Sequence, residues 1–146
     1  HDLYVIVENY YDQHASENAP IAHYSNSFYN FEDLQVVSNS TFPSASVKIS
    51  RGADILKASA VGSGPIDALY SAIADITKID IKLVEYNISS VSRGKEALGK
   101  VKITVEHEDE KYIAKAADTD ILRASALAYV NAINSIIAAK ISPVIV

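Results

Sequence analysis

The chain has 146 residues, of which 49% are apolar, and it carries a formal net charge of −5. This length and composition are those of a globular domain or of two small packed modules, and they exclude a disordered chain. The negative charge argues against a nucleic-acid partner. No uninterrupted apolar run is long enough to predict a membrane partner, and the absence of cysteine excludes disulfides and is compatible with a cytoplasmic location.

The beginning of the chain is predicted to be a connector. The sequence contains no methionine and opens with His1, so we expect it to be a piece of a longer protein. Apolar spacing predicts a short amphipathic helix over residues 2–12. An aromatic-rich stretch over residues 21–31 is expected to pack on a neighbouring surface. We therefore assign residues 1–31 to a connector and residues 32–146 to a domain.

From residue 32 onward, the pattern strand, strand, strand, helix occurs twice. Alternating apolar residues predict the strands, and apolar residues at helical spacing predict the helices. In the fourth strand, Val84, Tyr86 and Ile88 are predicted to share one face. The expected elements of the first module (32–78) are strands 33–40, 44–50 and 55–61 and a helix 65–77; those of the second (79–140) are strands 81–91, 97–106 and 111–117 and a helix 121–139.

Aligning Ala68 with Ala124 places the two copies in register, and this pairing is called the repeat alignment below. One such module has a single helix for three strands and little core. Two modules that stack on each other solve this problem, as internal repeats generally do. We therefore predict an α+β fold of two stacked βββα modules with internal pseudo-two-fold symmetry. A seam between the modules is a natural place for a small ligand.

The turn Gly62-Ser63-Gly64-Pro65 joins the third strand to the first helix. Its glycines place no bulky side chain over the helix start, and Pro65 suits the first helical position. The free N–H groups of such a start can bind an anion, including the carboxylate of a small ligand. A tight turn that only packs a helix on a sheet stays open as the alternative, because short glycine motifs are weak signals.

No set of catalytic residues is recognisable. The histidines, at positions 1, 14, 23 and 107, have no metal-ligand spacing, so we expect neither a metal nor another cofactor in this chain. Asp67 stands where a Gly-x-Gly-x-x-Gly motif would need its third glycine. Asp67, Asp118 and Asp120 are expected to act as helix-cap and helix-dipole residues. The chain is therefore not expected to be an enzyme by itself.

Five ordered motifs resemble the C-terminal regulatory domain of 2-isopropylmalate synthase, which related citramalate and homocitrate-type synthases share. The turn and helix start at 62–69 are similar to its Gly-x-Gly-Pro-Val-Asp-Ala-Leu signature. Residues 83–86 match its Leu-x-x-Tyr strand, and residues 97–101 match its Ala-Leu-Gly-x-Val segment. The opening strands and the final helix also match, so the likeness runs from about residue 33 to residue 137.

The resemblance implies a domain that forms a homodimer and binds the end product of a pathway. This effector would be leucine for isopropylmalate synthase and isoleucine for citramalate synthase. The parent enzyme would condense acetyl-CoA with a 2-keto acid on a TIM barrel that lies N-terminal to this chain and holds a divalent metal. A dimerisation module that binds no effector, and an unrelated small enzyme that uses scattered carboxylates, are the alternatives.

The resemblance also implies which residues bind the effector. They come from three parts of the chain, and Ser90 stands where the family usually has an apolar residue. By position they are Gly64, Pro65, Ile66 and Asp67 at the first helix start, Leu83, Tyr86, Ser90 and Ala97 in an apolar wall, and Asp118, Asp120 and Ile121 in the second module.

Overall fold

The structure is a computed structural model that describes residues 27–39, 41–93 and 96–141. The helix predicted over residues 2–12, and most of the predicted connector, lie outside the described residues. The division of the chain at residue 31 therefore stays a prediction.

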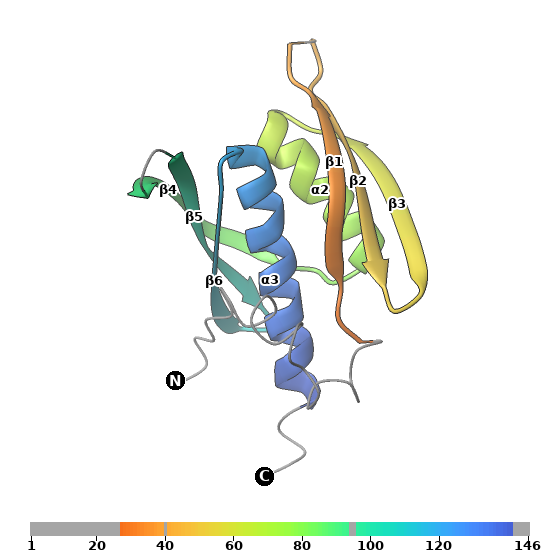
Figure 1. The fold of residues 1–146 in the computed structure, drawn as a ribbon. Coiled ribbons are helices and arrows are strands. Elements are labelled where there is room, and N and C mark those ends of the chain that lie inside the picture. The colour runs from red at the N-terminus through yellow and green to blue at the C-terminus, as the bar shows by residue number, and fades with distance from the viewer. Residues whose placement is uncertain (1–26, 40, 94–95, 142–146) are drawn as a thin grey trace.

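Two copies of one βββα module make up the described part of the chain, each with its own antiparallel three-stranded sheet (Figure 1). The sheet orders are β1-β2-β3 and β4-β5-β6, so each strand pairs with its neighbour in sequence. This arrangement confirms the predicted α+β fold. The elements are β1 Asn30–Val37, β2 Ser44–Arg51, β3 Asp54–Val61, α2 Pro65–Thr77, β4 Lys82–Arg93, β5 Glu96–His107, β6 Glu110–Asp118 and α3 Ile121–Ile141.

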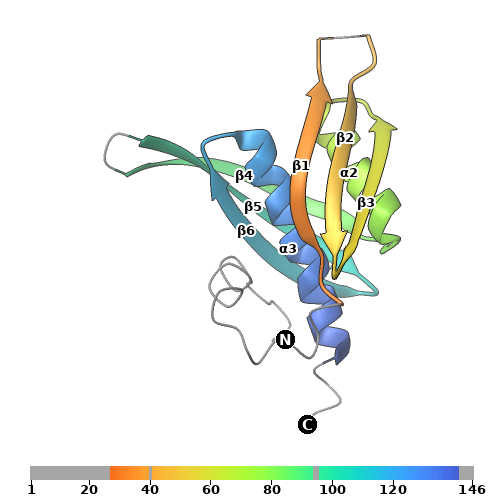
Figure 2. The same ribbon diagram turned by 45° about the vertical axis from the view of Figure 1, so that its right-hand side comes forward.

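The two helices lie between the two sheets. Helix α2 packs on β2 and β3, helix α3 packs on β5 and β6, and the helices also contact each other (Figures 1 and 2). Buried side chains from both modules form one continuous core, in which Ile49 and Ile73 of the first module join Ile103 and Ile133 of the second. Neither module has this core alone, which explains why the two stack.

The first strand begins at Asn30, three residues earlier than its predicted start. The reason lies just before it, where Phe28 and Tyr29 are buried. The Tyr29 backbone N–H donates to Asn134 Oδ1 at 2.9 Å, and Asn134 Nδ2 donates to the Tyr29 carbonyl at 2.9 Å. This pair of hydrogen bonds to α3 fixes the chain before β1. The aromatic stretch therefore packs on the domain, as expected, where the structure describes it.

A β-bulge occurs at the same place in each module. The pairing of β1 with β2 shifts after Phe31, and the pairing of β4 with β5 shifts after Leu83. Phe31 lies opposite Ile49 and Leu83 lies opposite Val105, and these two partners correspond in the repeat alignment. The repeated bulge supports the internal duplication down to single residues, since bulges are specific features of a strand pair.

The bulge in β4 corrects one prediction. Val84 has no partner in the register, so it adds one residue to the strand. Leu83, Tyr86 and Ile88 lie opposite inward-facing residues of β5, and they share the face that was predicted for Val84, Tyr86 and Ile88. The prediction assumed an uninterrupted period of two residues, which a bulge breaks.

Helix α3 has 21 residues and is long and apolar enough to cross a membrane by length and composition alone. The helix contains no uninterrupted apolar run of this length, because polar residues such as Asn131 and Asn134 interrupt the pattern. Most of the helix is buried inside the protein. Asn131 donates to the Lys115 carbonyl at 3.0 Å, so this polar side chain is used within the fold. These are the features of a core helix.

Candidate functional site

Two glycines with different roles shape the start of α2. A Cβ atom on Gly62 would collide with the backbone nitrogen of Ala68 and lie 2.8 Å from its Cα, so the close approach of turn and helix requires glycine there. A Cβ on Gly64 would meet nothing within 4 Å, and the backbone of Gly64 is extended. Gly64 is the N-cap residue, and glycine has no side chain that could accept a hydrogen bond from the first N–H groups of the helix. The helix start is thus open.

Asp67 lies in the first turn of α2 and turns back toward the loop. Its Oδ2 atom accepts hydrogen bonds from the Ser63 backbone N–H at 2.9 Å and from the Ser63 hydroxyl at 3.3 Å. This position suits a negative charge, because helix N-termini carry a partial positive charge. Asp67 therefore holds the turn in place, as expected of a helix-cap residue, and it also lies on the edge of a cavity.

That cavity has a volume of about 510 Å³ and lies between α2, β4 and α3. The volume is within the range of about 300–1,000 Å³ that is usual for small-molecule sites. Aromatic and aliphatic side chains dominate its walls, and Asp67 is its one charged residue. The lining residues are Ile66, Asp67, Tyr70, Ser71, Ala74, Ile81, Leu83, Tyr86 and Tyr129.

The structure brings four predicted site residues together around this cavity, namely Ile66, Asp67, Leu83 and Tyr86. Leu83 and Tyr86 are three residues apart, so they would face opposite sides of a regular strand. The bulge at Val84 removes this conflict and turns both side chains to one face. Gly64 and Pro65 directly precede the cavity residues at the helix start.

The floor of the cavity is a cluster of tyrosines. The Tyr70 ring lies 4.3 Å from that of Tyr129 and meets that of Tyr86 edge-on at 6.4 Å between centroids. Burial raises the pKa of Tyr70 well above its usual range, and burial, with a smaller effect of Asp80, raises the pKa of Tyr129 to about 12. Both phenols are therefore neutral near pH 7 and form an uncharged floor.

The remaining predicted site residues do not line the cavity. Ser90 and Ala97 lie on the β4–β5 hairpin, which extends beyond the helices (Figure 2), and both are exposed. Asp118, Asp120 and Ile121 lie at the start of α3. One chain thus brings only part of the predicted set together, and the binding roles of all these residues stay predictions.

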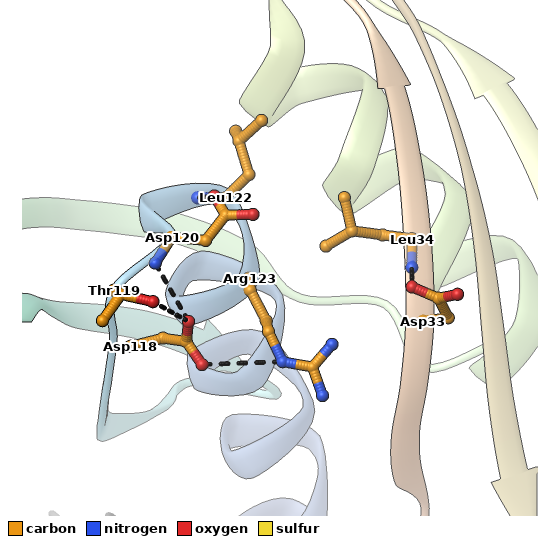
Figure 3. Close-up of polar contacts among 7 residues, drawn as sticks. All are labelled: Asp33, Leu34, Asp118, Thr119, Asp120, Leu122 and Arg123. Atoms are coloured by element: carbon orange, nitrogen blue, oxygen red, sulfur yellow. Dashed lines mark hydrogen bonds and ion pairs between the residues drawn. The ribbon is translucent and has the colours of Figure 1, made fainter.

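The start of α3 is closed by its own side chains (Figure 3). Asp120 Oδ1 accepts the Leu122 backbone N–H at 2.9 Å, which is an N-cap hydrogen bond, and Asp118 Oδ1 accepts the Asp120 N–H at 2.9 Å. Arg123 Nε lies 3.5 Å from Asp118 Oδ2, and its guanidinium lies 5.1 Å from the centre of the Phe31 ring. Asp120 thus caps the helix, as expected, whereas Asp118 binds the backbone N–H of this cap residue rather than a backbone N–H of the helix itself.

Comparison with known proteins identifies the family. Residues 1–137 match the family described as the LeuA allosteric (dimerisation) domain. The chain belongs to this family. This confirms the resemblance found in the sequence, and the match includes the residues that were assigned to a connector.

Several relatives of this LeuA domain are named 2-isopropylmalate synthase. The chain is 42% identical over 137 residues to a 2-isopropylmalate synthase of Geobacillus sp. (strain Y412MC10), covering 94% of this chain and 25% of the relative. It is 47% identical over 96 residues to that of Sediminispirochaeta smaragdinae, covering 66% and 19%, and 42% identical over 109 residues to that of Pyrococcus furiosus, covering 74% and 22%. The chain thus spans about a fifth to a quarter of these relatives.

Sequence reasoning missed five cavity-lining residues of this LeuA domain, namely Tyr70, Ser71 and Ala74 of α2, Ile81 just before β4, and Tyr129 of α3. Both tyrosines belong to the apolar helical spacing that predicts the helices over residues 65–77 and 121–139, and both are buried. Their hydroxyl groups were the available signal, because a buried phenol needs a hydrogen-bond partner. Among the residues that the structure describes, no group of three or more His, Cys, Asp or Glu side chains could hold a metal.

One face of β4 in the LeuA domain is left largely uncovered. Leu83, Tyr86, Ile88 and Ser90 lie opposite inward-facing positions of β5, but α3 packs on β5 and β6 instead. Leu83 and Ile88 are accordingly exposed. The cavity therefore opens beside an apolar strip of the sheet.

Proposed function

We propose that this chain is the effector-binding regulatory domain of a 2-isopropylmalate synthase, and that its effector is leucine. The supporting observation is the cavity, which has an apolar wall at Leu83 and Tyr86 and is lined at the helix start by Asp67. The uncapped N-cap residue of this helix, Gly64, lies three residues before Asp67. A branched-chain amino acid has an apolar end and a charged end that match these two parts. The family description as an allosteric domain and the names of the relatives agree with this function.

The chemistry of the complex follows from the cavity. The first-turn N–H groups of α2 would bind the leucine carboxylate, because helix N-termini favour anions. Asp67 uses Oδ2 to hold Ser63, so its other carboxylate oxygen would accept the leucine ammonium group. Ile66, Leu83 and Tyr86 would surround the isobutyl group, whose full burial stabilises a complex by about 1.5–3 kcal/mol. Binding would regulate the enzyme if leucine favours one of two states.

Isothermal titration calorimetry of the 146-residue chain tests this proposal. Leucine should bind with one site per chain, more tightly than isoleucine or valine. Tighter binding of isoleucine would point to a citramalate synthase instead. If none of the three amino acids releases heat or raises the melting temperature, the domain is a dimerisation module without an effector.

A matched pair of variants tests the location of the site. Tyr86 lies opposite Ile103, and Leu34 lies opposite Val47, which is the equivalent position in the first module. Tyr86→Ala should weaken leucine binding more than tenfold while the chain stays folded, because it removes a cavity wall. Leu34→Ala should leave the affinity unchanged. If the Tyr86→Ala variant bound leucine as tightly as the parent chain, the site would lie elsewhere.

Catalysis by the whole enzyme is part of the same proposal. Acetyl-CoA and a 2-keto acid would condense on a separate domain that holds the divalent metal, and this chain would act in regulation rather than in catalysis. The enzyme would work in the cytoplasm, without a nucleic-acid or membrane partner. Mixing the chain with acetyl-CoA and a 2-keto acid should therefore release no CoA thiol above the rate without protein.

We further propose that the domain forms a homodimer through the uncovered face of β4. A second copy would cover the exposed Leu83 and Ile88 and close the cavity from the open side. Ile88→Glu should then convert the dimer into a monomer in sedimentation experiments, because a charge would be buried at the interface. Ile55→Glu is the matched control, since Ile55 is 53% exposed on the other sheet and Ile88 is 52% exposed.

A further inference from the structure

Ser125, in the second turn of α3, binds both of the tyrosines that α2 and β4 contribute to the cavity. Tyr70 donates its hydroxyl to the Ser125 carbonyl at 2.9 Å, and Tyr86 Oη lies 2.6 Å from Ser125 Oγ. Ser125 itself is completely buried and does not line the cavity. Any effect that it has on a ligand must therefore act through the tyrosines.

The direction of these hydrogen bonds follows from proton counting. Ser125 Oγ donates to the Ile121 carbonyl at 2.8 Å, and a serine hydroxyl has only one proton to donate. Tyr86 must therefore donate its own proton to Ser125 Oγ. A chain of hydrogen bonds thus runs from the cavity wall on β4 to the backbone at the start of α3.

This connection exists only on the side of the open cavity. In the repeat alignment, Ser125 corresponds to Leu69, and Tyr86 corresponds to Leu34 through the strand register. Two aliphatic side chains cannot form a hydrogen bond. The pair of hydroxyl groups is therefore not a general requirement for stacking the modules.

We propose that Ser125 is a positioning residue for the cavity. It holds Tyr86 in the rotamer that forms the cavity wall, and it links ligand binding in that cavity to helix α3 of the second module. The inference rests on the proposed function, because it concerns the same site.

The expected size of the effect follows from preorganisation. Tyr86 lies on a strand that the helices leave largely uncovered, so its ring has other rotamers to occupy once its hydroxyl loses its partner. If the binding-competent rotamer falls to about a tenth of the population, the apparent affinity falls about tenfold. The Tyr70 bond to the Ser125 carbonyl survives a change of side chain, so the helix contact itself is kept.

The binding experiment uses Ser125→Ala, Tyr86→Phe and the double variant in the 146-residue chain, titrated with leucine. Each single variant should bind about tenfold more weakly, and the double variant should bind no more weakly than either one. Ser135→Ala is the matched control, because Ser135 is also a completely buried serine of α3, and its hydroxyl has no hydrogen-bond partner in the described structure. Additive effects, or unchanged affinity, would overturn the proposal.

A second measurement needs no ligand. NMR of the chain with ring-labelled tyrosine should show one sharp set of Tyr86 signals in the parent and in Ser135→Ala, and broadened or multiple sets in Ser125→Ala. If the parent binds no amino acid but these signals change as expected, the proposed function fails and the positioning role stands. If the parent binds leucine and Ser125→Ala changes neither the signals nor the affinity, the positioning role fails alone. Should Ser125→Ala not fold, Tyr86→Phe is prepared with ring-labelled phenylalanine, and the ring at position 86 should then give broadened or multiple sets of signals.

Discussion

Helices α2 and α3 begin at equivalent positions of the two modules, but the side chains at their first turns differ. At the start of α2, Gly64 supplies no cap, and the carboxylate of Asp67 turns back to Ser63. At the start of α3, the corresponding residues are Asp120, whose side chain caps the helix, and Arg123, which covers an aromatic ring of β1. The same backbone plan thus gives one open and one closed helix start.

The residues one and two turns further along the helices show the same difference. Ser71 and Ala74 line the cavity beside α2, and in the repeat alignment they correspond to Leu127 and Val130 of α3. Larger side chains thus occupy the second module where the first leaves space. Two copies of a module can keep the same core and still differ in function, because the size of a few helix side chains decides whether a cavity is left beside the helix.

The largest expected effect separates the two glycines of the open turn. Gly62→Ala should lower the free energy of unfolding by about 3 kcal/mol, since the new methyl group would collide with the backbone of Ala68. Gly64→Ala should change it by less than about 0.5 kcal/mol, because nothing lies near the new atom. Urea denaturation of both variants measures the difference. Equal losses would show that the two glycines do not differ in role.

The second prediction converts the open start into a closed one. Gly64→Asp places a capping carboxylate where α3 has Asp120. The free energy of unfolding should rise by a few tenths of a kcal/mol, because a cap replaces glycine. Leucine affinity should fall more than tenfold, since the new carboxylate would compete for the same N–H groups and repel the ligand.

Calorimetry of the Gly64→Asp variant measures its affinity for leucine, and urea denaturation measures its free energy of unfolding. Gly64→Asn is the neutral control, which caps the helix without adding charge and should lose less affinity. Unchanged leucine binding in the Gly64→Asp variant would place the ligand carboxylate away from the start of α2.

The regular parts of the fold followed from the sequence, because they depend on local patterns. Alternation in β2 and helical spacing in α2 placed these elements within one residue of their observed ends. The start of β1 was missed, because Tyr29 is held by Asn134 of α3, which lies 105 residues away in the sequence. Contacts of this range leave no trace in a local pattern.

The site was predictable only in part, for the same reason. The turn at residues 62–65 indicated an open helix start, and the resemblance pointed to Leu83 and Tyr86. The bulge that turns these two side chains to one face was not visible in the alternation of β4. The contribution of Tyr129 depends on how the modules stack, so only the three-dimensional structure shows it.

The third prediction concerns the closed start. Arg123→Ala should lower the free energy of unfolding by about 0.5–1 kcal/mol, because it removes the contact with Phe31 and a partly exposed ion pair with Asp118. It should not create a second leucine site, since Leu127 and Val130 still fill the space beside α3. Calorimetry should give one leucine per chain before and after the change. A second site would show that Arg123 alone closes the second module.

The smallest expected effect is that of pH near neutrality, and it concerns the open side alone. Tyr129 corresponds to Ile73 and Tyr70 to Ala126, so only the open cavity has titratable residues at its floor. Burial raises the pKa of Tyr70, and it raises that of Tyr129 to about 12. Both pKa values lie above that of an unfolded tyrosine, about 10. The contribution of the two phenols to the free energy of unfolding is therefore complete below about pH 10 and is lost as the pH rises through their pKa values in the folded protein.

Tyrosine ionisation should therefore change neither leucine affinity nor the free energy of unfolding between pH 7 and pH 9, and the latter should begin to fall above about pH 10. Absorbance of tyrosinate, followed together with urea denaturation, separates the buried phenols from the others. Tyr129→Phe should bind leucine as the parent does at pH 8 and should lose less stability above pH 10. If affinity falls between pH 7 and pH 9 in the parent but not in Tyr129→Phe, the floor of the cavity is not the uncharged surface that its burial requires.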